Sequence, residues 1–257
     1  MRKKIVAGNW KMNLSYAEAM TLADALVNAV EENASPDIIL ASPFIYLHEL
    51  ISRIQGNPNF YMAAQNCSEH QKGAFTGEVS APMLASIGIE HVLIGHSERR
   101  TLYGESDVVL RSKVDRAIES GLIPIFCCGE MLAERNAGSH FQRVADQLNN
   151  GLFGISEKQM KECIIAYEPV WAIGTGVTAS SEQAQEMHAF IRSEIAKKYS
   201  AELADTISIL YGGSVNAQNA AELFTCKDVD GGLVGGASLK SAEFISIIRA
   251  MESVSTN

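Results

Sequence analysis

The chain has 257 residues, of which 47% are hydrophobic and 20% charged, and its formal net charge is -9 at neutral pH. This balance is typical of a globular protein with a large core, and it excludes the disordered and fibrous classes. The acidic total argues against general nucleic-acid binding, which needs a basic face, but it is compatible with a small basic pocket for an anionic metabolite. We therefore expect no nucleic-acid partner.

The N-terminus and the cysteines favour a cytoplasmic protein. The apolar run from Ile5 ends after four residues at Asn9, which is too short for a signal peptide, and no run approaches the length of a membrane span. Five cysteines are scattered without metal-ligand spacing, so neither a disulfide framework nor a zinc site is expected. They are Cys67, Cys127, Cys128, Cys163 and Cys226. The adjacent Cys127 and Cys128 fit small buried hydrophobes better than a redox pair.

Eight short apolar segments recur along the chain and are typical of buried strands. They cover residues 5–7, 38–41, 60–64, 92–94, 123–126, 164–167, 207–211 and 232–234. Stretches with helical periodicity lie between them, such as 16–30 and 181–198; the second begins with a capping sequence and carries Met187, Phe190 and Ile191 on one face. Strands and helices therefore alternate from end to end.

This alternation predicts an α/β fold, a single-domain (β/α)8 TIM barrel over residues 1–257, with eight parallel strands surrounded by helices. The units average about 32 residues, which suits a βαβ repeat, and together they match the roughly 250 residues of such a barrel. The main alternative is a doubly wound open sheet. That fold predicts a Gly-x-Gly-x-x-Gly turn after the first strand, and this chain has Gly8-Asn-Trp-Lys11 there.

Polar residues and glycines follow the predicted strands. They are Gly8-Asn9, Gln65-Asn66, Gly95-His96-Ser97, Gly129-Glu130, Glu168, Gly212-Gly213-Ser214 and Gly235-Gly236. In a parallel barrel all these strand ends share one face, which is the face that carries the chemistry. We expect one pocket there.

Glu168 closes an apolar strand and opens directly into a loop that resembles a lid. Pro169 restricts the backbone around it, and Gly174 and Gly176 leave a tip that can bring backbone N–H groups against an anion. On its own, the pattern also fits an ordinary surface glutamate before a turn. With the other strand ends, it predicts a general base under a closing loop.

Four further side chains would complete a proton-transfer site. His96 lies between a strand and a possible helix start, whose N–H groups would lower the pKa of the imidazole. Lys11 and Asn9 follow the first strand, and Glu98 near Lys11 would hold the ammonium in place. Singly, each residue has an ordinary alternative: a structural histidine, a solvated lysine, an Asx turn or a salt-bridged rim.

Two glycine turns follow the seventh and eighth strands, where such barrels frequently bind phosphate through backbone N–H groups. They are Gly212-Gly213-Ser214 and Gly235-Gly236, and plain tight turns are the alternative. Together the groups suit proton transfer beside the carbonyl of a phosphorylated substrate. Such a reaction needs no redox cofactor, because the hydrogen moves as a proton.

Five motifs give the whole chain a resemblance to the triosephosphate isomerase family. They are Gly8-Asn-Trp-Lys-Met-Asn13, Ile94-Gly-His-Ser-Glu-Arg-Arg100, Ala166-Tyr-Glu-Pro-Val-Trp-Ala-Ile-Gly-Thr-Gly176, Tyr211-Gly-Gly-Ser214 and Gly235-Gly-Ala-Ser238. The resemblance implies interconversion of dihydroxyacetone phosphate and D-glyceraldehyde 3-phosphate, a reaction of glycolysis and gluconeogenesis. Another phosphate-binding barrel enzyme and an inert sugar-phosphate binder are the alternatives. A ring-forming synthase should have longer loops, and an inert binder has no use for Glu168 with His96.

The resemblance also implies residue roles. Glu168 becomes the base, neutral His96 polarises the oxygens, and Lys11 and Asn9 stabilise negative charge; this family is the standard example of a neutral histidine beside a glutamate base. The implied phosphate contacts are the backbone N–H groups of Gly174, Ser214, Gly235 and Gly236. Tyr211 would latch the closed loop, and Cys127 and Glu98 match supporting positions.

Two loops carry further expectations from the resemblance. In the lid at 166–179, Val177 stands where many members of the family have Lys or another polar residue, which concerns the rate of loop closure rather than the chemistry. The long segment after the third strand exposes Phe75, and in the family this loop inserts into a partner subunit. The resemblance therefore implies a homodimer through the loop at 73–77, with Thr76 at its tip.

Overall fold

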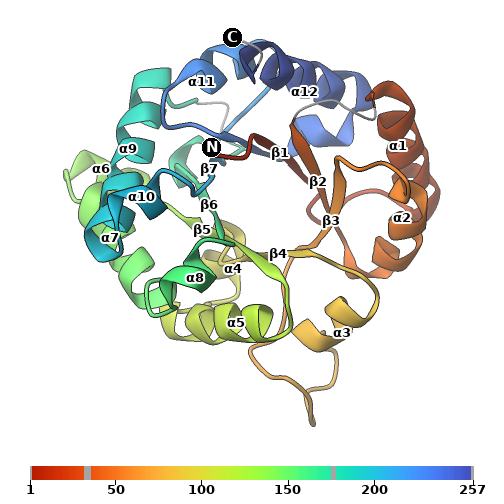
Figure 1. Cartoon of the computed structure of the whole chain (residues 1–257), viewed down its shortest axis with the longest axis horizontal. Helices are drawn as coiled ribbons and strands as arrows, with labels where there is room; N and C mark the ends of the chain where they lie inside the picture. The colour runs from red at the N-terminus through yellow and green to blue at the C-terminus, as the bar shows by residue number, and fades with distance from the viewer. Residues whose placement is uncertain (1, 32–35, 175–177, 256–257) are drawn as a thin grey trace.

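The computed structural model describes residues 2–31, 36–174 and 178–255. Eight parallel strands form a closed barrel in chain order, with β1 paired to both β2 and β8 (Figure 1). The strands are β1 (Ile5–Asn9), β2 (Asp37–Ser42), β3 (Phe60–Ala64), β4 (His91–Ile94), β5 (Ile123–Cys128), β6 (Ile164–Tyr167), β7 (Ile209–Tyr211) and β8 (Gly231–Val234). The predicted fold class is confirmed.

Helices surround the barrel as an outer ring (Figure 1). The longer ones are α1 (Tyr16–Ala29), α2 (Leu47–Ile54), α5 (Asp107–Glu119), α7 (His140–Gly151), α9 (Ser181–Lys198) and α12 (Ser241–Ser255). The shorter ones are α3 (Ala81–Ser86), α4 (Ser97–Leu102), α6 (Leu132–Asn136), α8 (Glu157–Met160), α10 (Ala201–Ala204) and α11 (Ala220–Thr225), with 3-10 turns η1 (Phe44–Tyr46), η2 (Val170–Ala172) and η3 (Gly236–Leu239). No helix in these ranges is long and apolar enough to cross a membrane.

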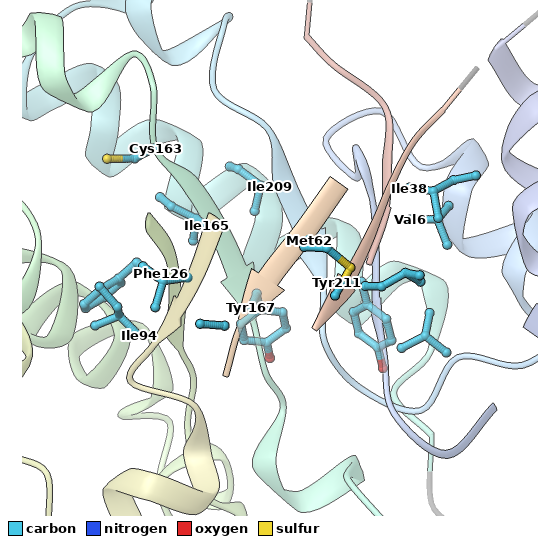
Figure 2. Packing of buried hydrophobic residues seen from close by; sticks show 14 of the residues in the cluster. Val6, Ile38, Met62, Ile94, Phe126, Cys163, Ile165, Tyr167, Ile209 and Tyr211 are labelled. Carbon is cyan, nitrogen blue, oxygen red and sulfur yellow. The ribbon is translucent and has the colours of Figure 1, made fainter. Parts of the chain in front are cut away.

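Two layers of apolar side chains hold the barrel together, because successive residues of a strand point to opposite faces. Ile5, Ala7 and Leu93 belong to a cluster inside the barrel. Alternate residues such as Val6 and Ile38 belong to the larger cluster between strands and helices, part of which is shown in Figure 2. Burial on both faces explains why the strands appear in the sequence as continuous apolar runs.

The boundaries differ from the prediction in one informative place. The seventh strand was expected from residue 207, but β7 begins at Ile209. The N–H of Ile209 donates to a carboxylate oxygen of Asp230, and the hydroxyl of Ser208 donates to the carbonyl of Lys3. At the start of β7, a side chain and not a neighbouring strand therefore accepts the hydrogen bond from the backbone N–H of Ile209.

The segment between β3 and α3 is irregular and projects well beyond the ring of helices (Figure 1). Phe75 is 41% exposed near its tip and stacks on His70, with 3.7 Å between the ring centroids. Thr76, next to it, is also exposed. The predicted long loop with an exposed Phe75 is therefore present.

Candidate active site

One cavity of about 320 Å³ lies at the carboxyl ends of the strands. Its walls come from segments that follow β1, β4, β6, β7 and β8, which are far apart in the chain. They include all eight residues predicted to act on or bind the substrate: Asn9, Lys11, His96, Glu168, Gly174, Ser214, Gly235 and Gly236. The expected convergence of strand ends on one pocket is present.

Glu168 is buried at the end of β6, with only 1% of its surface exposed. Its Oε2 accepts a hydrogen bond of 2.9 Å from the backbone N–H of Ser97, and its Oε1 lies 3.0 Å from Nε2 of His96. Oε1 receives no well-aligned hydrogen bond from the described residues. The carboxylate therefore rests against the start of α4, with one oxygen only partly satisfied.

His96 caps α4 through its imidazole. Its Nδ1 accepts a hydrogen bond of 3.2 Å from the backbone N–H of Glu98, an arrangement that suits a neutral ring with its proton on Nε2. Burial lowers the pKa of His96, but the neighbouring Glu168 carboxylate raises it, and the net direction is upward. The sequence-based expectation of a lowered pKa is thus wrong for this arrangement, because it did not include a carboxylate in contact with the ring.

Lys11 has a strained backbone, with φ at +53°, in the left-handed region that residues other than glycine rarely adopt. Its N–H donates to Oδ1 of Asn9, and its carbonyl accepts a hydrogen bond from the side chain of Gln65. Its Nζ lies 2.6 Å from a carboxylate oxygen of Glu98. The expected Lys11–Glu98 pair is therefore present, and the local backbone holds the ammonium at the cavity.

The glycine turn after β7 makes room for Glu168. A Cβ on Gly212 would lie 2.9 Å from Cγ of Glu168, and one on Gly213 would overlap the hydroxyl of Tyr211. The turn after β8 is more open, since nothing lies within 4 Å of a Cβ on Gly236. Glycine is thus required by close approach after β7, whereas after β8 it leaves space in the cavity.

The segment predicted to form a lid begins on a buried anchor. Glu130 accepts hydrogen bonds at Oε1 from the hydroxyl of Tyr167 at 3.0 Å and the indole N–H of Trp171 at 2.8 Å. Gly174 has φ at +68°, which suits a loop tip. The predicted departure at Val177 lies outside the described residues.

Two predicted supporting residues, Tyr211 and Cys127, are buried beside the site. The hydroxyl of Tyr211 is buried, and burial raises the pKa of this phenol to about 12, against a lowering effect of the Ala179 backbone. The thiol of Cys127 faces the barrel interior, and burial raises its pKa well above the ordinary value. Cys127 thus packs beneath the site as an un-ionised side chain.

A second cavity of about 350 Å³ adjoins the first. It shares Asn9, Lys11 and His96 with it, and its outer wall carries the exposed side chains of Met12 and Ile45. Thr76, in the segment between β3 and α3, lines neither of these two cavities. Within the described ranges, no group of three or more metal-binding side chains comes together.

The family model of triosephosphate isomerase matches residues 4–251. The chain belongs to the triosephosphate isomerase family. It is 52% identical to a triosephosphate isomerase of Cytophaga hutchinsonii over 252 residues, which are 97% of this chain and 100% of that protein. It is 53% identical to one of Porphyromonas gingivalis over 251 residues, 97% of this chain and 100% of the relative, and 48% identical to one of Flavobacterium johnsoniae, 98% and 100%.

Two contacts in the site of this triosephosphate isomerase family member could not be predicted from its sequence. Ser97 holds the Glu168 carboxylate through its backbone N–H, and Gln65 holds the Lys11 loop by donating to the carbonyls of Lys11 and Ala41. A backbone N–H leaves no signal in the residue type. Gln65 was visible only as one polar residue at a strand end.

Proposed function

We propose that the protein catalyses the interconversion of dihydroxyacetone phosphate and D-glyceraldehyde 3-phosphate, as an isomerase without a cofactor. The observation that carries this proposal is one buried carboxylate in contact with one imidazole, beside an ammonium, in a cavity lined by two glycine turns. An inert binder of sugar phosphates would need the turns but not the Glu168–His96 pair. A family match over nearly the whole chain supports the same choice.

In this proposal Glu168 is the base. It removes a proton from one carbon beside the carbonyl and returns it to the neighbouring carbon through an enediolate. The carboxylate must first leave the N–H of Ser97 and the ring of His96, and turn into the cavity that it lines. Its partly satisfied Oε1 makes this departure less costly than for a fully bonded carboxylate.

His96 is the proposed electrophile. The N–H of Glu98 occupies Nδ1, so the proton of the neutral ring sits on Nε2, the nitrogen now next to Glu168. When the carboxylate moves to the substrate, its upward effect on the pKa of His96 is withdrawn, and burial keeps the ring neutral. Nε2–H is then free to donate to the substrate oxygens as they become negative.

Lys11, Asn9 and backbone N–H groups stabilise the negative charge of the substrate in this proposal. Lys11 contributes a cation to the cavity wall, and its backbone N–H donates to Oδ1 of Asn9. We assign the phosphate to the N–H groups of Gly174, Ser214, Gly235 and Gly236, all of which line the cavity. The lid at 166–179 then covers the substrate and excludes water, with Tyr211 as its latch and Cys127 and Glu98 in support.

The proposed assembly is a cytoplasmic homodimer. Several large apolar side chains are exposed around the second cavity, namely Met12, Phe44, Ile45 and Tyr103, and contiguous apolar surface of this kind marks a protein interface. We propose that the loop at 73–77, with Thr76 at its tip, enters this cavity of the partner subunit. That arrangement would cover the apolar surface and support the Lys11 loop from outside. We also propose that residues 1–257 form a single (β/α)8-barrel domain in each subunit.

A coupled assay on purified protein tests the activity. D-Glyceraldehyde 3-phosphate is supplied, and formation of dihydroxyacetone phosphate is followed through a dehydrogenase that consumes it. Carrying out the reaction in deuterated water adds a mechanistic readout, because an enediolate route places solvent deuterium on a carbon of the product. Absence of turnover would overturn the proposal and favour the inert binder.

A further inference from the structure

A buried glutamine on α7 grips the backbone next to the site. The side chain of Gln147 is 99% buried. Its Oε1 accepts a hydrogen bond of 2.7 Å from the N–H of Gly129, and its Nε2 donates one of 3.0 Å to the carbonyl of the same residue. One amide thus satisfies both backbone groups of a residue just beyond the end of β5, where no strand pairing remains to do so.

Gly129 lies directly against the backbone of Glu168. A Cβ at residue 129 would overlap the carbonyl of Glu168, so only glycine permits this approach. The residues on either side of Gly129 bond to the Glu168 segment as well. The N–H of Glu168 donates to the carbonyl of Cys128 at 2.8 Å, and the N–H of Val170 donates to the carbonyl of Glu130 at 3.1 Å.

Residues 128–130 therefore form a short backbone template for residues 168–170, and Gln147 holds the middle of the template. We propose that Gln147 is a positioning residue for Glu168: through Gly129 it sets where the base and the first hinge of the lid lie, without touching the substrate. This inference rests on the proposed function, in which Glu168 is the base. Gln147 does not line the cavity, so its effect has to pass through the template.

The substitution Gln147→Met tests the proposal, because it removes both hydrogen bonds at similar side-chain volume. Since a displacement of the base of about 1 Å can cost about a hundredfold, we expect kcat to fall about tenfold or more, with KM for the triose phosphate changing by less than about threefold. The matched control is Leu148→Ala, which damages the buried core one residue further along α7 without removing a bond to Gly129. Its kcat should stay within about twofold of wild type at temperatures where it is folded.

The substitution Gln147→Glu provides a second route, should the methionine variant fail to fold. An ionised carboxylate can accept from the N–H of Gly129 but cannot donate to its carbonyl, whereas a protonated one can do both. The ratio of variant to wild-type kcat should therefore rise as the pH falls. A merely structural role for Gln147 predicts no such pH dependence of turnover in folded protein.

Hydrogen exchange provides a readout that does not depend on activity. Amides of Glu168 and Val170 should exchange faster in Gln147→Met than in Leu148→Ala, because their acceptors at 128 and 130 are released. Wild-type kcat in Gln147→Met, an equal loss in Leu148→Ala, or a flat pH ratio in Gln147→Glu would overturn the proposal. An inactive wild-type protein would overturn the proposed function instead, and the exchange comparison would still decide the role of Gln147.

Discussion

The carboxylate of Glu168 and the imidazole of His96 are in contact, with 3.0 Å between Oε1 and Nε2. Both are buried, and the N–H of Ser97 holds the other carboxylate oxygen. The two groups proposed to act on the substrate thus lie against each other at the end of β6 and the start of α4. Because the two side chains are in contact, substitutions at or beside them can test the position of the carboxylate, the protonation of the ring and the space around Glu168.

Shortening the base tests its proposed role. Glu168→Asp keeps the charge but withdraws the carboxylate by one methylene, and misplacement of about 1 Å can cost about a hundredfold in rate. We expect kcat to fall a hundredfold or more while KM changes little, since the proposed phosphate contacts are untouched. Steady-state kinetics in both directions would check this. An unchanged kcat would remove Glu168 as the base.

Replacing the imidazole tests the proposed electrophile. His96→Gln retains a polar side chain but loses the ring N–H aimed at the cavity, and the loss of one such contact costs about 10²-fold or more. We expect this reduction in kcat, measured in the coupled assay. Circular dichroism would verify that the cap on α4 is retained. Turnover like that of the wild type would exclude His96 from the mechanism.

The Glu168–His96 contact also predicts a coupled titration. Removing the negative charge in Glu168→Gln takes away the cause that raises the pKa of His96, so the pKa should be lower in the variant than in the wild type. NMR titration of the imidazole would measure both values. A pKa that is equal or higher in Glu168→Gln would contradict the assignment.

The sign of the linked stability follows from the same shift. A folded-state pKa above the ordinary value means that His96 contributes stability below its unfolded-state pKa, and this contribution disappears as the pH rises through the folded-state pKa. Replacing Glu168 by Gln should therefore reduce the stability gained on the acid side. Denaturant unfolding of both proteins at several pH values would show it.

The barrel and its pocket could be predicted because each depends on patterns that are local in the sequence. A strand buried on both faces reads as an apolar run, and its carboxyl end is marked by the next polar residue or glycine. Parallel pairing then places all such ends on one face. Glu168, His96 and Lys11 meet for this reason, although nothing in their sequence spacing brings them together.

The contacts that position these groups could not be predicted in the same way. The bond from Ser97 to Glu168 uses a backbone N–H, which every residue except proline has. The grip of Gln147 on Gly129 depends on how α7 is rotated against the barrel. The direction of the pKa shift of His96 depends on the rotamer of Glu168. The residue types alone predict neither of these two contacts, nor the direction of the pKa shift.

Space beside the base provides a further prediction. In Gly212→Ala the new methyl group would lie 2.9 Å from Cγ of Glu168 and 3.1 Å from the carbonyl of Tyr167, so the base must shift. We expect kcat to fall about tenfold or more with a smaller change in KM. Gly232→Ala is the control, because its nearest new contact is an ordinary 3.4 Å to the ring of Phe224. Equal kinetics for the two variants would show that Gly212 does not set the position of Glu168.

The projecting loop provides the last prediction, which concerns the proposed dimer. Thr76→Arg places a long cation on an exposed tip that makes no contact with the barrel cavity of its own chain, so the monomer fold should be unaffected. In a dimer, however, that tip would enter the partner's cavity beside Lys11, where a second cation is repelled and its desolvation is costly.

Sedimentation velocity should then show a dimer for the wild type and a monomer for Thr76→Arg. Activity should fall with dissociation, since the Lys11 loop loses its outer support and its strained backbone can relax. Lys72→Ala, a change at an exposed residue of the same loop, should leave both properties unchanged. A wild-type monomer with full activity would refute the dimer and, with it, any contribution of a partner subunit to the site.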